Sequence, residues 1–152
     1  MTTPTLKAQL RSDLTTAMKA RDELRSATLR MTLAAITTEE VAGKVARELS
    51  DDEVLKVIGR EVKKRKEAAE AFAGAGRAEQ AAREEAEGEV LTAYLPAQLS
   101  DEELQVLVDA AVAETGAEGP RGMGAVMKVL TPRVAGRADG SRVAAAVKAK
   151  LS

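Results

Sequence analysis

The side chains best suited to chemistry in this sequence are cations in its last third. Between Pro120 and Ser152 the chain carries seven arginines and lysines and a single acid, Asp139. Clustered cations of this kind bind polyanions such as nucleic-acid phosphates, or they pair with acids elsewhere in the same protein. The candidates for phosphate contact are Lys128, Arg133, Arg137 and Arg142.

One of these cations lies in a predicted loop, Gly136-Arg137-Ala138-Asp139-Gly140. Glycines permit positive φ angles, and Asp139 is suited to cap the helix that follows, so the segment can be a turn and nothing more. Alternatively, Arg137 adds a cation beside a helix N-terminus, where backbone N–H groups favour a phosphate. The sequence leaves both interpretations open.

A second basic run, from Arg60 to Lys66, falls on a predicted helix. Glutamates at helical spacing, among them Glu61 and Glu67, partly neutralise this run, so a solvated helix face is the alternative to a binding site. The candidates for contact with nucleic acid here are Lys63, Lys64 and Lys66.

Histidine and cysteine are both absent from the sequence. Their absence excludes disulfides, zinc sites built on thiolate or imidazole, and catalysis by a Cys–His pair or a Ser–His–Asp triad. The acidic clusters 51–53 and 101–103 lie in predicted first helical turns, where negative charge offsets the helix dipole, and their spacing diagnoses no Mg²⁺ site. No Walker-type phosphate loop and no dinucleotide fingerprint is present. We therefore expect no catalytic residue, no cofactor and no metal.

The stretch from Tyr94 to Leu104 is a joint between the helices that carry the first group of cations and those that carry the second. Pro96 has no backbone N–H and biases the residue before it away from the helical region, so a helix should end there. Ser100 is suited to cap the next helix, and a glutamate three residues later completes a capping box. We interpret the joint as the boundary between two domains, 1–95 and 96–152. The alternative is an ordinary helix–helix turn inside one bundle.

Before the joint, apolar residues recur every three or four positions, first from Leu6 to Met18 and again from Leu24 to Ile36. Asp22 is suited to cap the second of these helices, unless the two stretches form one continuous rod. The second stretch is apolar on two sides, because Met31 lies on one side and Leu29 on another. That pattern predicts a helix sandwiched between neighbours.

A third helix is predicted after Ser50, whose capping box with Glu53 repeats that of the joint. Its apolar stripe is interrupted at Arg65 and Lys66, and two glycines separate it from a fourth helix. After the joint, three shorter helices are predicted, the last of them following Asp139. The predicted fold is therefore all-α, with an elongated N-terminal bundle of about four helices and a C-terminal three-helix domain.

No stretch of the sequence approaches the roughly 20 apolar residues of a membrane-spanning helix. The first residues are polar and do not have the pattern of a signal peptide. The sequence therefore predicts a soluble, cytoplasmic protein with no membrane partner.

Four segments together, in sequence and in order, resemble the YqeY family. They are Arg60–Ala68, Tyr94–Ser100, Gly122–Lys128 and Gly136–Gly140. Across essentially the whole chain, the resemblance implies an all-helical fold with a helical N-terminal part and a three-helix C-terminal part. The family is similar to the tail of GatB, the tRNA-binding subunit of the amidotransferase that converts Glu-tRNA(Gln) or Asp-tRNA(Asn) to the amidated form. In GatB this tail is associated with tRNA contact, whereas other domains carry out the transfer.

Three functional hypotheses follow. In the first, the chain is a non-catalytic accessory of tRNA-dependent amidation or aminoacylation that binds tRNA. With one Phe and one Tyr in the chain, contact of Lys and Arg with the RNA backbone is favoured over base stacking, and DNA is not an expected partner. In the second, it is a protein–protein adaptor that docks on a synthetase or an amidotransferase. The third, implied by kinship alone, is carbon–nitrogen ligase activity with glutamine as amido-N-donor, for which the chain has no plausible glutaminase nucleophile.

The surroundings of the C-terminal cations discriminate between the first two hypotheses. Convergence of these cations on one exposed face favours RNA. Pairing with the acidic stretch from Asp101 to Glu118 favours the adaptor.

Overall fold

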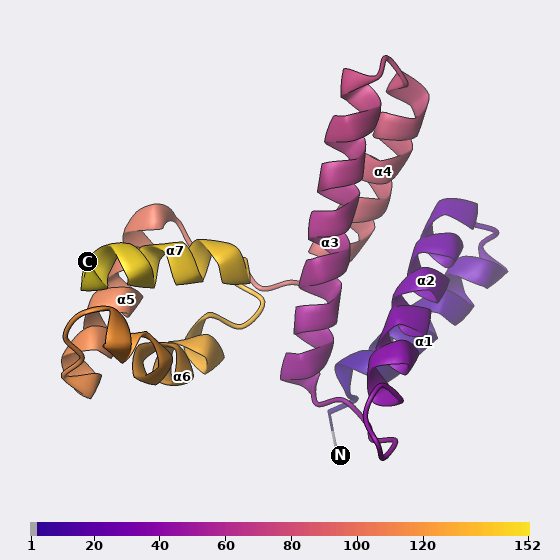
Figure 1. The fold of residues 1–152 in the computed structure, drawn as a ribbon. Coiled ribbons are helices and arrows are strands. Elements are labelled where there is room, and N and C mark those ends of the chain that lie inside the picture. Colours follow the sequence, from indigo (N-terminus) through magenta and orange to yellow (C-terminus); the bar gives the residue numbers. More distant parts are fainter. Residues whose placement is uncertain (1–2) are drawn as a thin grey trace. The chain divides into compact units, whose positions relative to one another are not determined.

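The computed structural model describes residues 3–152, and every regular element within that range is a helix. Figure 1 shows the helices in chain order. The α-helices are α1 (Leu6–Lys19), α2 (Glu23–Glu40), α3 (Asp51–Gly74), α4 (Ala78–Thr92), α5 (Asp101–Thr115), α6 (Met123–Val134) and α7 (Gly140–Leu151), and a short 3₁₀ helix, η1 (Pro120–Gly122), precedes α6. The predicted all-α fold is confirmed.

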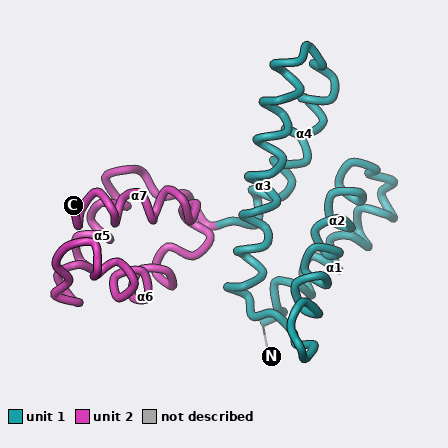
Figure 2. Tube along the Cα trace, in the orientation of Figure 1, with its two compact units in different colours: residues 1–95 teal, residues 96–152 magenta. Residues whose placement is uncertain are grey.

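The chain divides into two compact units, coloured separately in Figure 2. Unit 1 ends at Leu95 and contains α1 to α4, and unit 2 runs from Pro96 to Ser152 and contains α5 to α7. Each unit has its own apolar core.

Unit 1 consists of two helical hairpins, α1–α2 and α3–α4, and α2 lies against both helices of the second hairpin. Because aromatic residues are almost absent, the core is built from aliphatic side chains packed between helices. Its fully buried members include Leu10, Leu29, Ile36, Ile58 and Leu91.

In unit 2, α6 and α7 each pack against α5 and against each other. Their shared core includes Leu104, Val108, Val126, Leu130 and Val147, each at most 2% exposed. Gly116 ends α5 with a φ of 63°, in the left-handed region that glycine adopts without steric cost.

Two helices, α3 and α5, begin with the same local motif. The hydroxyls of Ser50 and Ser100 accept hydrogen bonds from the backbone N–H groups of Glu53 (3.3 Å) and Glu103 (3.1 Å). The glutamate carboxylates accept in return from the serine backbone N–H groups, at 3.2 and 2.9 Å. Both predicted helix starts are confirmed, and a cap of this kind typically contributes about 0.5–2 kcal/mol.

The first two helices are separate rather than one rod. Arg21 has a φ of 57°, which turns the chain out of the helical path between α1 and α2. Asp22 then caps α2 by accepting a hydrogen bond from the backbone N–H of Arg25 at 3.1 Å. The cap predicted at Asp22 is therefore confirmed, and the alternative of a continuous rod is wrong.

The prediction that α2 is sandwiched on both of its apolar sides is wrong for one side. Leu29, Thr32 and Ile36 are buried against the neighbouring helices. On the other side Met31 is 52% exposed and Ala34 is exposed. The helices of unit 1 bury the first side, whereas the second side stays largely exposed and is reached by Arg65 of α3, whose Nη2 atom donates to the Sδ atom of Met31 at 3.8 Å.

The apolar stripe of α3 is not interrupted at Arg65, because this arginine is itself buried, with a side chain 3% exposed. Its Nη1 atom donates to the backbone carbonyl of Glu61 at 3.2 Å and lies 3.3 Å from the Glu61 carboxylate. Its Nε atom lies 3.3 Å from the Glu87 carboxylate of α4, without the alignment of a hydrogen bond. Glu87 also accepts from Arg83, at 3.0 Å. Buried charges therefore hold α3 against α4.

No helix within residues 3–152 combines the length and the apolar character that crossing a membrane requires.

The capping box of α3 makes the stability of unit 1 sensitive to acid. The guanidinium of Arg47 and the backbone N–H of Ser50 both donate to the Glu53 carboxylate and lower the pKa of Glu53 to about 2. Because this pKa is lower in the folded chain than in the unfolded chain, where it is about 4.3, the stabilisation is complete above that pH and is lost as the pH falls towards 2.

We expect the Glu53→Gln variant to have a melting temperature that falls less than that of the unchanged chain between pH 5 and pH 2. Melting curves followed by circular dichroism across this range measure the difference. Glu48→Gln, which removes an exposed carboxylate from the loop just before α3, is the matched control. An unchanged pH profile for Glu53→Gln would contradict the assignment.

Candidate nucleic-acid interface

The four cations predicted in unit 2 come from three successive segments. Lys128 and Arg133 lie on α6, Arg137 lies in the loop that follows, and Arg142 lies in the first turns of α7. Both α6 and α7 pack against α5, which is the acidic helix of this unit. The fold therefore brings the basic segment next to the acidic one.

Three cations of the basic segment form ion pairs with acids of α5. The distance from Arg133 to Glu114 is 2.6 Å, and that from Arg142 to Asp101, at the start of α5, is 2.7 Å. A third cation, Lys150, lies 3.3 Å from Asp109. The hydrogen bond from Arg133 lowers the pKa of the Glu114 carboxyl. These pairs extend along the length of α5, so much of the basic charge is compensated within the unit.

The loop that carries Arg137 is anchored by its backbone. The carbonyl of Arg137 accepts from the N–H of Leu99 at 2.8 Å, and the carbonyl of Gly136 accepts from the side chain of Gln98 at 2.9 Å. The Asp139 carboxylate accepts from the N–H of Ser141 at 3.2 Å. Asp139 thus caps α7 as predicted, and its negative charge stands where a phosphate at this helix N-terminus would have to lie.

Two of the predicted cations have no ion pair with any residue in the range 3–152. Lys128 is exposed on α6, and Arg137 is half-buried in the loop. The positive charge of Arg137 contributes to lowering the pKa of Glu103, after the backbone and hydroxyl hydrogen bonds of Ser100. From Pro96 onward the chain carries seven acids and seven bases, so unit 2 has no net positive charge that would draw RNA towards it.

The three lysines predicted on α3 are all exposed. At 3.6 residues per turn, Lys64 and Lys66 point about 160° apart around the helix. Lys64 lines an open hollow of about 390 Å³ together with Glu39, Arg60 and Glu61, whereas Lys66 is exposed and does not line it. Arg60 is also paired with Glu39, at 3.4 Å. Lys63 and Lys66, three residues apart, lie about 60° apart around the helix, so these two share a side and Lys64 does not lie on it.

The sequence interpretation missed the burial of Arg65, although a signal for it was present. Arg65 stands three residues after Val62 and four before Ala69, which is the spacing of the buried stripe. A charged residue at such a position is either a break in the stripe or a buried partner for acids on a facing helix. Arg65 is the second case, and the acid on the facing helix is Glu87 of α4.

The described residues thus form an all-helical protein in which many charged side chains form ion pairs within their own unit and others are exposed. The chain belongs to the Yqey-like protein family, whose model matches residues 7–151. A curated relative from Schizosaccharomyces pombe, "Uncharacterized protein C22F3.15", is 35% identical over 99 residues, which cover 64% of this chain and 78% of the relative. The family predicted from the four sequence motifs is therefore confirmed.

Proposed function

We propose that this chain is a non-catalytic adaptor that docks on a tRNA-handling enzyme, either an aminoacyl-tRNA synthetase or a tRNA-dependent amidotransferase. The observation that carries the proposal is the pairing of Arg133 and Arg142 with acids of α5. Cations that already face carboxylates have less attraction for phosphate than free ones, which favours a protein partner over RNA. The class of enzyme comes from the family's resemblance to the tail of GatB.

The composition supports a role in binding rather than in catalysis. Without histidine or cysteine the chain has no thiolate nucleophile and no imidazole base, which are the usual groups for glutamine hydrolysis and acyl transfer. In this proposal the amidation or aminoacylation chemistry belongs to the partner enzyme.

Copurification from an extract treated with ribonuclease tests the proposal. We expect a synthetase or an amidotransferase subunit to remain bound to the chain after RNA has been digested, and the purified pair to bind when mixed. Loss of all such enzymes on ribonuclease treatment would contradict direct docking and would favour an RNA bridge.

Direct contact with tRNA is the second candidate, and one specific observation favours it. Lys128 and Arg137 have no ion pair with a described residue, and the pairs that the other cations make are exposed. Exposed pairs are weak, so a polyanion such as tRNA can compete for their cations. In this alternative, backbone phosphates of tRNA displace the acids of α5, and binding weakens steeply with salt.

A further inference from the structure

The exposed side of α2 has an unusual composition for a helix surface. From Ser26 to Thr38 the helix contains a single charged residue, Arg30. Solvent-facing sides of helices normally carry charged and polar residues, whereas Ala27, Met31 and Ala34 follow one another here at helical spacing. With Met31 52% exposed and Ala34 exposed, this α2 face (Ala27, Met31 and Ala34) is an apolar stripe that stays largely accessible, although the Sδ atom of Met31 accepts from Nη2 of Arg65 of α3 at 3.8 Å.

An open hollow of about 370 Å³ lies at the N-terminal end of the α2 face. Its apolar lining includes Met18, which is 50% exposed, and Ala27 of the stripe. Methionine side chains are flexible and polarizable, and exposed ones are frequent on surfaces that accept a partner's apolar side chain. The complete lining is Met18, Arg21, Glu23, Ser26, Ala27 and Arg30.

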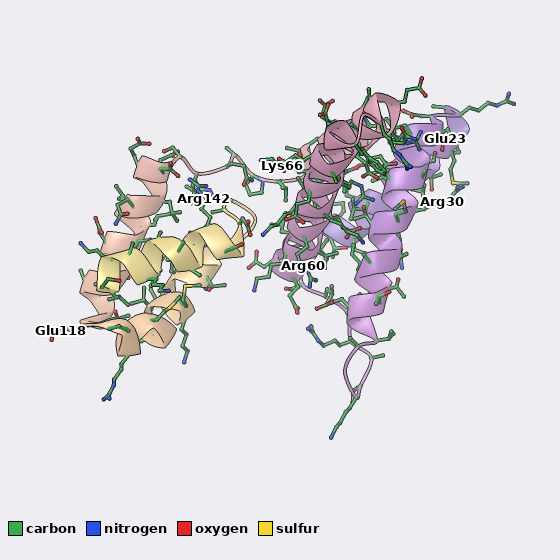
Figure 3. The ribbon with its side chains drawn as sticks, turned by 45° about the horizontal axis from the view of Figure 1, so that its top comes forward. Glu23, Arg30, Arg60, Lys66, Glu118 and Arg142 are labelled. Carbon is green, nitrogen blue, oxygen red and sulfur yellow. The ribbon has the colours of Figure 1, made fainter. Side chains whose placement is uncertain are left out.

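The hollow carries uncompensated positive charge. Its one acid, Glu23, is held by Arg83 of α4 through two hydrogen bonds of 2.8 and 3.1 Å. Neither Arg21 nor Arg30 forms an ion pair with any residue of the described range. Figure 3 shows Glu23 and Arg30 on the same side of α2. The two arginines therefore remain available to an acidic partner.

The backbone at Arg21 provides a separate reason to attribute a function to its side chain. Arg21 adopts a φ of 57°, its N–H donates to the carbonyl of Met18, and the next N–H donates to Ala17. This is the helix-ending arrangement in which glycine is strongly preferred, because a side chain there costs about 1–2 kcal/mol. Positions that break a local rule are often functional, and here the arginine extends a cation beside the hollow.

We propose that the α2 face binds an amphipathic helix of a partner protein, one that carries acidic residues beside its apolar stripe. Laying an apolar helix face against an apolar stripe is a common mode of recognition, and the flanking charges set its orientation and specificity. An apolar side chain of the partner enters the hollow, and its carboxylates pair with Arg21 and Arg30. The inference rests on the proposed adaptor function and adds to it the surface and the chemistry of the contact.

Site-specific photo-crosslinking tests the inference with the full-length chain in cells. p-Benzoylphenylalanine replaces Ala34 in the α2 face, and in the control it replaces Gln80, an exposed residue of α4. Mass spectrometry identifies the crosslinked segment of the partner. We expect position 34, and not position 80, to crosslink to a helical segment with apolar residues at helical spacing and acidic flanks.

Binding of a synthetic peptide with the identified sequence completes the test. We expect the double variant Arg21→Glu/Arg30→Glu to weaken this peptide at least tenfold, while Arg21→Lys/Arg30→Lys retains most of the affinity. Equal affinity in the charge-reversed variant would overturn the proposal. So would a crosslink from position 34 to a second copy of the chain, a crosslink to a basic segment, or a yield no higher than at position 80.

The outcome separates this inference from the proposed function. If a tRNA-handling enzyme copurifies but position 34 does not crosslink to it, the adaptor function stands and the α2 face is not the contact. If position 34 crosslinks to an acidic amphipathic helix of a protein that handles no tRNA, the α2 face stands and the proposed function fails.

Discussion

Replacing Arg65 with alanine is expected to cost unit 1 about 3–5 kcal/mol of its free energy of unfolding. The guanidinium is 3% exposed and lies between Glu61 and Glu87, whose side chains are 13% and 10% exposed. Its removal leaves two carboxylates in a poorly solvated site with less positive charge to offset them, which is the costly way to break a buried ion pair. Urea denaturation of the full-length chain measures the change.

Two further variants make the result specific to the buried charge. Lys66→Ala changes the neighbouring exposed residue of α3 and should lie within about 0.5 kcal/mol of the unchanged chain. Arg65→Met combined with Glu87→Leu exchanges charge for apolar volume and should recover much of the loss. A cost below about 1 kcal/mol for Arg65→Ala would mean that the arginine is solvated in solution.

Leu130→Ala in α6 is the second substitution with a large expected effect, about 2–5 kcal/mol. Leu130 is fully buried in the core shared by α5, α6 and α7. Folded domains have only about 0.05–0.15 kcal/mol of stability per residue, so in a unit as small as unit 2 this loss is a large part of the total. We expect the amide NMR signals of unit 2 to collapse towards random-coil positions at temperatures where the unchanged chain remains folded.

Val106→Ala on α5 is the matched control, because Val106 is 66% exposed and its truncation leaves no cavity. It should change the free energy of unfolding by no more than about 0.5 kcal/mol. If Leu130→Ala behaved like this control, the core of unit 2 would have to be packed differently from the structure described above.

The helix boundaries of this chain were predictable because their causes are local. The two serine capping boxes, the caps at Asp22 and Asp139, and the glycine that ends α5 each depend on residues within four positions of one another. Apolar periodicity then indicated the helices themselves, including the three shorter helices α5 to α7. Signals that depend only on residues close together in the sequence were therefore sufficient to predict the all-α fold.

What the sequence could not provide is the pairing between helices. Arg65 becomes a core residue only because α4 supplies Glu87, and Met31 is 52% exposed although its Sδ atom accepts from Arg65 of α3. The cations near the C-terminus stood out in the sequence, but their engagement with α5 depends on how α5, α6 and α7 pack. Such contacts join residues that lie far apart along the chain, where no spacing rule applies.

The proposed docking on a protein rather than on RNA depends on the engagement of the C-terminal cations by α5. Fluorescence anisotropy with labelled tRNA across a salt series tests it most directly. The unchanged chain is compared with the triple variant Asp101→Asn/Asp109→Asn/Glu114→Gln, which removes the ion-pair partners, and circular dichroism confirms that both are folded.

We predict little or no tRNA affinity for the unchanged chain even at low salt, and a gain of affinity in the triple variant. In that variant log K should fall against log salt with a slope of about −2 to −3, as expected for about three cations released to contact phosphates. Engagement of the cations by α5 would be contradicted if the unchanged chain bound tRNA with a slope of about −3 to −4, if Arg137→Ala flattened that slope by about one, and if the triple variant bound no better.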